Sequence, residues 1–409
     1  MSTRKLMSAS FANLLIPISG LAVSPFLSRE LGPAGRGLYA ALTLPVVVCG
    51  WFGTYGLQDA LSFHLRNGRL SRQAAARVSL AAAVPLGLFG VGLLSVVGLV
   101  LFAGDGARYG QFLVLSLLAP LHILANLLIG ALTGASDIRG VNLVKIVPAL
   151  TRTVVVIFAC LAFHLNAYWA SLLFLVSVTT GLVIGLPILR SSPAPAESTP
   201  SRTEAIPARS LITYSLTCLP GVLAAISSAR LDQVVGLPLI GPTQLGYYAV
   251  AVSVAEIPMV VATAARTVLL GRPAAVDPRR ATLVARVAML VSVLTCGMLA
   301  ATAGVTVPWV FGGAFAPAVA PTVILCGATI LYTGMIIFGA VLLANDRAGW
   351  SSAALVTGSL AGIALLFVLA PLGAVGAAVA SLGGYGVSVL VAAWAVGKAP
   401  DPRSLRMLT

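Results

Sequence analysis

Charged side chains are scarce in this sequence. They make up 9% of its 409 residues, whereas hydrophobic residues make up 59%, and the mean hydropathy is +1.02. A soluble domain cannot hide so much apolar surface in its own core. The composition therefore excludes a soluble globular protein and indicates that the lipid bilayer is the solvent of the chain.

Other absences narrow the function further. Gly-x-x-x-x-Gly-Lys-Ser/Thr does not occur, which excludes ATP binding by a P-loop, so any energy that the protein uses is expected from an ion gradient, the membrane potential or the gradient of another solute. The five cysteines have no CxxC or Cys/His partner, so no disulfide framework, metal site or cofactor is expected. The net charge of +14 does not predict a nucleic-acid partner, because the basic residues lie in short loops beside apolar segments, where they attract anionic membrane lipids.

Long apolar runs, in contrast, are abundant. A membrane-spanning helix needs roughly 20 mainly apolar residues, whereas the strands of a β-barrel would show short alternating patterns. The sequence predicts an all-α integral membrane protein with twelve transmembrane helices, at about 8–28, 36–57, 76–103, 111–132, 141–162, 167–189, 212–238, 245–268, 281–311, 318–343, 350–371 and 374–396.

One loop pattern occurs twice, 209 positions apart. Residues 31–40 and 240–249 hold Gly, Pro, Gly, Tyr and Ala in the same register, and Asp137 matches Asp346. The same shift carries the first six predicted helices onto the last six. The chain is therefore expected to contain two six-helix bundles related by a pseudo-two-fold axis, as in secondary transporters. Each Gly-Pro pair is expected to form a tight outer turn.

The domains and their orientation follow from the repeat and from the charges. The predicted domains are an N-terminal bundle (1–190), a proline-rich linker (191–208), a C-terminal bundle (209–398) and a tail (399–409). Twenty of the 25 Lys and Arg residues lie at the termini, in the even-numbered gaps or near the helix ends that border these gaps. Because positive charge stays on the cytoplasmic side, both termini are expected in the cytoplasm and the protein in the plasma membrane.

Some residues near the ends of predicted helices are expected to be structural. Arg36 is counted as an outer-loop cation, Tyr39 and Tyr248 as members of aromatic belts at the membrane surface, and His64 as a solvated side chain. The segment 58–75, with leucines at regular spacing, is expected to be an interfacial helix.

Three motifs carry a resemblance to a known family. They are Leu27-Ser28-Arg29-Glu30-Leu31-Gly32-Pro33 with Gly37-Leu38-Tyr39-Ala40, then Arg230-Leu231-Asp232-Gln233-Val234-Val235-Gly236, and Pro371-Leu372-Gly373-Ala374-Val375-Gly376. With the twelve-helix plan, the chain resembles the Wzx-type polysaccharide-biosynthesis flippases of the multidrug/oligosaccharidyl-lipid/polysaccharide exporter (MOP) superfamily. The resemblance implies a MATE/MOP-like fold and movement of an undecaprenyl-pyrophosphate-linked oligosaccharide across the bilayer by alternating access. It also implies glycosyltransferases and a polysaccharide polymerase as functional partners.

Few ionisable residues lie inside the predicted helices, where each costs at least ~2.5–3.5 kcal/mol. Arg152, Arg230 and Lys145 are expected to bind the anionic cargo, because guanidinium and ammonium groups pair with phosphate oxygens. Asp232 and Glu256 are expected to set the geometry of these cations or to take up the coupling proton or sodium ion. The alternative is that all these groups neutralise one another as static pairs.

Three other functions compete with that of a flippase. An ion-coupled drug or metabolite exporter of the same superfamily is the main alternative, although one for cationic drugs would call for more acidic than basic groups in its cavity. A lipid II flippase typically carries two extra helices, for which this chain has no room. A membrane glycan polymerase or ligase needs a large outer loop, and the outer gaps here are short. The protein is therefore expected to be a transporter and not an enzyme.

Overall fold

The computed structural model describes residues 3–191, 208–270, 278–345 and 347–398, which form helices joined by short connections and contain no strand. The all-α class is therefore confirmed. The first repeat contains α1 (Thr3–Phe52), α2 (Leu57–Arg66), α3 (Arg72–Leu101), α4 (Gly106–Ser116), α5 (Ala119–Gly134), α6 (Ile138–Ala162), α7 (Ala167–Val176) and α8 (Val178–Ser191). The second contains α9 (Ala208–Ala255), α10 (Met259–Leu270), α11 (Pro278–Phe311), η1 (Gly313–Ala318), α12 (Val319–Ala344), α13 (Ala348–Leu369), η2 (Ala370–Leu372) and α14 (Gly373–Gly397).

The helix bounds follow the 209-residue shift. Shifted by this amount, α6 would run from 347 to 371, and α13 spans Ala348–Leu369. In the same way α3 would run from 281 to 310, and α11 spans Pro278–Phe311. For these two pairs the repeat in the sequence is also a repeat of helix lengths.

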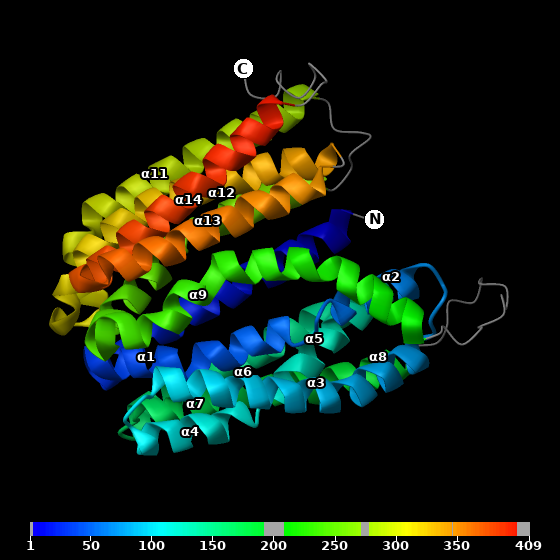
Figure 1. Ribbon diagram of the computed structural model, residues 1–409, viewed down its shortest axis with the longest axis horizontal. Helices are drawn as coiled ribbons and strands as arrows, with labels where there is room; N and C mark the ends of the chain where they lie inside the picture. The colour runs from blue at the N-terminus through cyan, green and yellow to red at the C-terminus, as the bar shows by residue number, and fades with distance from the viewer. Residues whose placement is uncertain (1–2, 192–207, 271–277, 346, 399–409) are drawn as a thin grey trace. The chain divides into compact units, whose positions relative to one another are not determined.

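Helices α1 and α9 are each broken at the repeated glycine. Gly32 has φ 64° and ψ 179°, and Gly241 has φ 78° and ψ 167°. A straight helix with the 50 residues of α1 would be about 75 Å long, more than twice the hydrocarbon core of a bilayer. Figure 1 shows that α1 instead folds back on itself. The glycines therefore form the turns that the sequence predicted, because only glycine adopts this backbone conformation readily.

The chain divides into two compact units. The first unit consists of Met1–Val23 with Ala41–Ile226, and the second of Ser24–Ala40 with Ser227–Thr409. The two glycine turns thus belong to the same unit, although they come from different repeats. The predicted division into bundles 1–190 and 209–398 stays a prediction.

Close backbone contact explains why the turns belong together. In the second unit, a Cβ atom added to Gly37 would overlap the carbonyl oxygen of Pro242, and one added to Gly246 would overlap the carbonyl oxygen of Pro33. Each contact is the other shifted by 209 residues. Such reciprocity is the mark of a local two-fold relationship.

Each unit has its own apolar core. In the first unit, α2, α3, α5, α6 and α8 bury a cluster that includes Leu61, Leu127 and Leu132. In the second, α9, α11, η1 and α12 bury one that includes Val250, Phe311 and Phe315.

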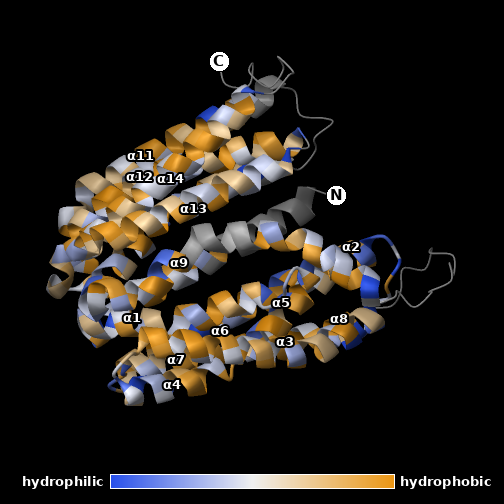
Figure 2. Cartoon of the chain, viewed as in Figure 1, coloured by the Kyte–Doolittle hydropathy of each residue, from blue (hydrophilic) through white to orange (hydrophobic). Residues whose placement is uncertain are grey.

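Large apolar side chains are also exposed on the outside of the helices. Leu88 and Phe89 of α3 are 67% and 61% exposed, and Leu294 and Trp309 of α11 are 62% and 76% exposed. Figure 2 shows hydrophobic residues along most of the length of these helices. Soluble proteins rarely show such surfaces, and acyl chains would cover them.

Eight helical stretches of the described residues are long and apolar enough to span a membrane, or nine if a bent pair counts as one span. Pro17–Phe52 counts once although it contains the break at Gly32, and Ala348–Gly397 counts once although it contains both α13 and α14. The protein therefore has the character of a multi-pass membrane protein. The number of twelve helices and the cytoplasmic termini stay predictions.

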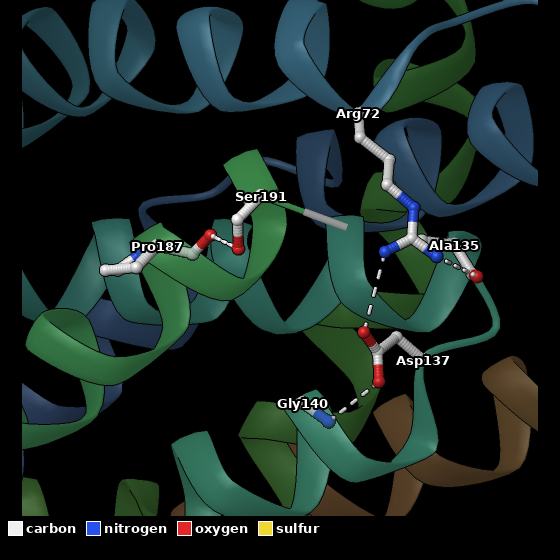
Figure 3. A network of polar contacts seen from close by, with 6 residues as sticks. All are labelled: Arg72, Ala135, Asp137, Gly140, Pro187 and Ser191. Carbon is white, nitrogen blue, oxygen red and sulfur yellow. Dashed lines mark hydrogen bonds and ion pairs between the residues drawn. The ribbon is translucent and has the colours of Figure 1, made fainter. Parts of the chain in front are cut away.

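A polar network ties three helices of the first unit together (Figure 3). The Arg72 guanidinium at the start of α3 lies 3.5 Å from Asp137 and donates a hydrogen bond of 3.2 Å to the carbonyl oxygen of Ala135. Asp137 accepts a 2.9 Å hydrogen bond from the Gly140 amide and thereby caps α6. Its repeat partner, Asp346, lies outside the described residues.

Candidate functional site

Arg152 is held in the first unit by two neighbours from other helices. It lies on α6, and its guanidinium donates a 3.0 Å hydrogen bond to the hydroxyl of Ser19 on α1. The same group lies 4.8 Å from the ring centre of Phe174 on α7. A hydroxyl oxygen and the face of an aromatic ring both attract a cation. Arg152 is thus half-buried, and residues of α1 and α7 fix the position of its guanidinium.

Lys145 lies seven residues before Arg152 on the same helix and is also half-buried. Residues seven apart occupy one face of a helix. The structure therefore places two cations in line along α6.

Asp232 belongs to a network of hydroxyl groups in the second unit. The Tyr248 hydroxyl donates a hydrogen bond to its carboxylate, and the Ser381 hydroxyl of α14 lies 3.4 Å from the same carboxylate oxygen. The Ser381 oxygen is 2.7 Å from the Tyr248 oxygen, so Ser381 can donate its one hydrogen either to Tyr248 or to the carboxylate. The backbone N–H of Gln233 donates a 2.8 Å hydrogen bond to the other carboxylate oxygen of Asp232. The network joins both arms of α9 to α14.

Glu256 lies where the helical backbone is interrupted. α9 ends at Ala255 and α10 begins at Met259, with a bend of 50° between them. The carbonyl oxygen of Ala255 accepts a 2.9 Å hydrogen bond from the Thr329 hydroxyl of α12. This bond supplies a donor to a backbone carbonyl at the end of the broken helix. Broken helices within a membrane are frequent places for ion and substrate sites.

The predicted site residues are thus distributed over both units. Arg152 and Lys145 lie in the first, and Asp232 and Glu256 in the second. Arg230 is on α9 in the second unit, but its side chain lies outside the described part of the chain. Their convergence on one cargo site stays a prediction. Across the residues that the structure describes, no three His, Cys, Asp or Glu side chains gather as a metal site would require.

Three sequence-based expectations are wrong. Arg36 is not an outer-loop cation but lies in α1 with 8% exposure, bonded to Ser24 and stacked over Tyr39. Tyr39 and Tyr248 are not belt residues, because they are 7% and 1% exposed. His64 is not solvated, because its exposure is 2%. All four lie on helices, and packing within their own unit buries them.

Comparison of the two repeats indicates that the side chains of Arg36 and Asp232 are wholly or partly buried. Shifted by 209, Arg36 falls on Leu245, which is fully buried, and Asp232 falls on Val23, which is 4% exposed. A charged residue in one repeat that replaces a buried apolar residue in the other points to a buried charge.

No model of a known protein family and no curated protein matches the sequence. Solved structures do match. The inward-facing conformation of a multidrug resistance MATE family transporter of the MOP superfamily is 16% identical, with a TM-score of 0.72 over 94% of this chain and 97% of that chain.

Two further structures agree with it. The lipid II flippase MurJ in an inward closed conformation is 13% identical, with a TM-score of 0.73 over 98% of this chain and 89% of that chain. The MATE multidrug transporter DinF-BH, solved as a complex with a ligand, is 16% identical, with a TM-score of 0.69 over 100% of this chain and 98% of that chain. The chain therefore has the fold of the MATE transporters and of MurJ.

Proposed function

We propose that this protein moves a lipid-linked oligosaccharide of the undecaprenyl-pyrophosphate type from the inner to the outer leaflet of the plasma membrane, by alternating access, during cell-surface polysaccharide biosynthesis. The observation that carries the proposal is Arg152, a half-buried cation in an apolar helix, positioned by Ser19 and Phe174. A cation in this position attracts an anionic cargo. The fold supports it, since one protein of the same fold is a lipid II flippase.

The chemistry of the cargo fits these cations. A pyrophosphate presents several oxygens, and a guanidinium binds two of them side by side. Lys145, on the same face of α6, adds a second positive charge along the path. Arg230 is the third cation of the proposal.

Asp232 is the proposed coupling residue. Tyr248 and Ser381 each carry a hydroxyl that can donate or accept a hydrogen bond, so the network suits both an ionised and a protonated carboxylate. On protonation Asp232 gains one hydrogen to donate, so one of its hydrogen bonds, to Tyr248 or to Ser381, can reverse. A carboxyl group with two hydrogen-bonded arrangements is a means to link proton uptake to helix packing. Glu256, at the bend after α9, is the second carboxylate of the proposal.

Complementation of a strain that lacks its flippase tests this function. Arg152→Ala should abolish surface polysaccharide, because alanine cannot replace charge-assisted hydrogen bonds to phosphate. Arg152→Lys should give partial activity, because it keeps the charge and loses the fork. Arg139→Ala is the matched control, since it removes an exposed cation from the same helix. Full activity of Arg152→Ala at normal membrane abundance would refute the role of Arg152.

An ion-coupled drug or metabolite exporter is the second candidate. It is favoured by the two carboxylates in the second unit and by the MATE multidrug transporters among the structures of the same fold. Proteoliposomes discriminate the two functions. An exporter should transport a small fluorescent drug such as ethidium against an imposed proton or sodium gradient. A flippase should instead expose a fluorescent lipid-linked saccharide in the outer leaflet.

A further inference from the structure

A cavity of about 470 Å³ lies within the first unit, between α2 and the first turns of α9. Its walls combine an aromatic floor, two cations and hydroxyl groups. The residues that matter for the argument are Phe63, His64, Arg69, Arg209, Thr213 and Tyr214. Transport as proposed above uses none of them.

The floor of the cavity is a stacked aromatic pair. The rings of Phe63 and Tyr214 lie 4.3 Å apart at an angle of 16°. The His64 ring meets both at their edges, 5.4 Å from Phe63 and 5.8 Å from Tyr214. Flat apolar rings offer contact to hydrocarbon and not to a bare inorganic anion.

His64 adds an unused polar group. Its side chain is 2% exposed, and within the described part of the chain neither ring nitrogen has a hydrogen-bond partner. A buried polar atom left without a partner costs about 1–3 kcal/mol. A ligand in the cavity with an oxygen that accepts or donates a hydrogen bond would satisfy this imidazole.

The positive charges lie at the rim. Arg69 and Arg209 are exposed, and the Arg69 guanidinium lies 6.0 Å from the ring centre of Phe63. α2 connects a candidate span that ends at Phe52 to one that begins at Arg72. α2 buries Ala60 and Leu61 and ends at the exposed Arg66, and an amphipathic helix of this kind is expected at the depth of the lipid headgroups, where a phosphate and an acyl chain occur together.

We propose that this cavity binds the headgroup of an anionic phospholipid. Arg69 and Arg209 hold the phosphate, while the glycerol and the first acyl carbons cover the stacked rings of Phe63 and Tyr214. Thr213 and His64 supply the remaining hydrogen bonds. The proposal does not depend on the transported cargo, because the same site would serve a flippase or an exporter.

Thermal unfolding of the purified full chain in non-ionic detergent tests the site. Short-chain phosphatidylglycerol should raise the unfolding midpoint, since a ligand of the folded state stabilises it, while phosphatidylcholine should not. Arg69→Gln with Arg209→Gln should weaken the apparent affinity for phosphatidylglycerol by about tenfold or more, because charge-assisted bonds are lost. Both arginines are exposed, so the unliganded midpoint should stay close to that of the wild type.

Matched variants separate this site from general attraction between charges. Arg66→Gln with Arg190→Gln removes the same charge from exposed positions on α2 and α8 outside the cavity, and should leave the lipid effect intact. Phe63→Leu should weaken phosphatidylglycerol binding although it keeps both arginines.

Three results would overturn the proposal. One is an equal loss of the lipid effect in both arginine pairs, which would indicate surface charge alone. Another is an unchanged lipid effect in the Arg69/Arg209 pair. The third is an equal rise of the midpoint with inorganic phosphate, which would indicate a site for a free anion.

Discussion

Gly37 and Gly246 lie 209 positions apart in the sequence and pack against each other's turn. An added Cβ on Gly37 would come within 2.8 Å of the Gly246 amide nitrogen, and one on Gly246 within 3.2 Å of the Gly37 amide nitrogen. The two backbones touch because neither residue has a side chain. Small residues allow such close crossings of helices in membranes, where packing replaces the hydrophobic effect as the driving force.

Gly37→Ala and Gly246→Ala should therefore each destabilise the protein by about 1–3 kcal/mol, the usual cost of forcing extra atoms into a packed site. The effect of the two together should not be additive, since they disturb one crossing. Thermal unfolding in detergent measures both. Gly92→Ala is the control, because an added Cβ there meets nothing within 4 Å. Equal stability of all three variants would show that the crossing is not close in the membrane.

Substitution of Gly32 or Gly241 should destabilise the protein for a different reason than at Gly37 and Gly246. The constraint on Gly32 and Gly241 is the backbone conformation and not contact with neighbouring atoms. No atom lies within 4 Å of an added Cβ at either position. The positive φ with ψ near 180° is open almost only to glycine. Gly32→Ala should thus cost about 1–3 kcal/mol in unfolding free energy. Gly32→Asn should be no better, since asparagine relieves the strain only where ψ is near +45°. Rescue by asparagine would place Gly32 in the ordinary left-handed region instead.

The sequence predicted those features that depend on local chemistry and on comparison of the repeats. The turns at Gly32 and Gly241 could be predicted because both the residue types and their register are repeated. The all-helical class and the membrane character followed from hydropathy alone. The division into compact units could not be foreseen, because a close approach of two distant backbones, such as that of Gly37 and Gly246, leaves no periodic pattern.

The site was predicted only in part. Arg152 and Asp232 were found because a charge inside an apolar helix is conspicuous. Their partners, Ser19 and Tyr248, were not found, because a hydroxyl group in a membrane helix is common and its partner depends on tertiary packing. His64 was misjudged for the same reason, since its burial is created by Tyr214, which is 150 positions away.

His64 should make stability depend on pH. Burial, together with the nearby Arg69 charge, lowers the pKa of its imidazole below the ordinary 6.5. The unfolded chain therefore binds a proton first as the pH falls, so the free energy of unfolding should decrease between pH 6.5 and the lowered pKa and then level off. His64→Gln should remove this contribution. The free energy of unfolding of the variant should therefore decrease less than that of the wild type as the pH falls. His164→Gln, at an exposed position, should leave the profile unchanged.

The hydrogen bond between Tyr248 and Asp232 should be energetically strong while the carboxyl group is ionised, since a charged acceptor strengthens a hydrogen bond and the donor is buried. Tyr248→Phe should cost about 1.5–3 kcal/mol. In a double-mutant cycle with Asp232→Asn, the two changes should couple by about 0.5–3 kcal/mol, because each removes the same interaction. Tyr247→Phe is the neighbouring control, as its ring packs on Phe315 and not on the carboxylate. If Asp232 also takes up the coupling proton, Tyr248→Phe should shift the pH optimum of transport, whereas Tyr247→Phe should not. Additive free energies with an unshifted optimum would reduce the network to packing and leave Glu256 as the remaining coupling carboxylate.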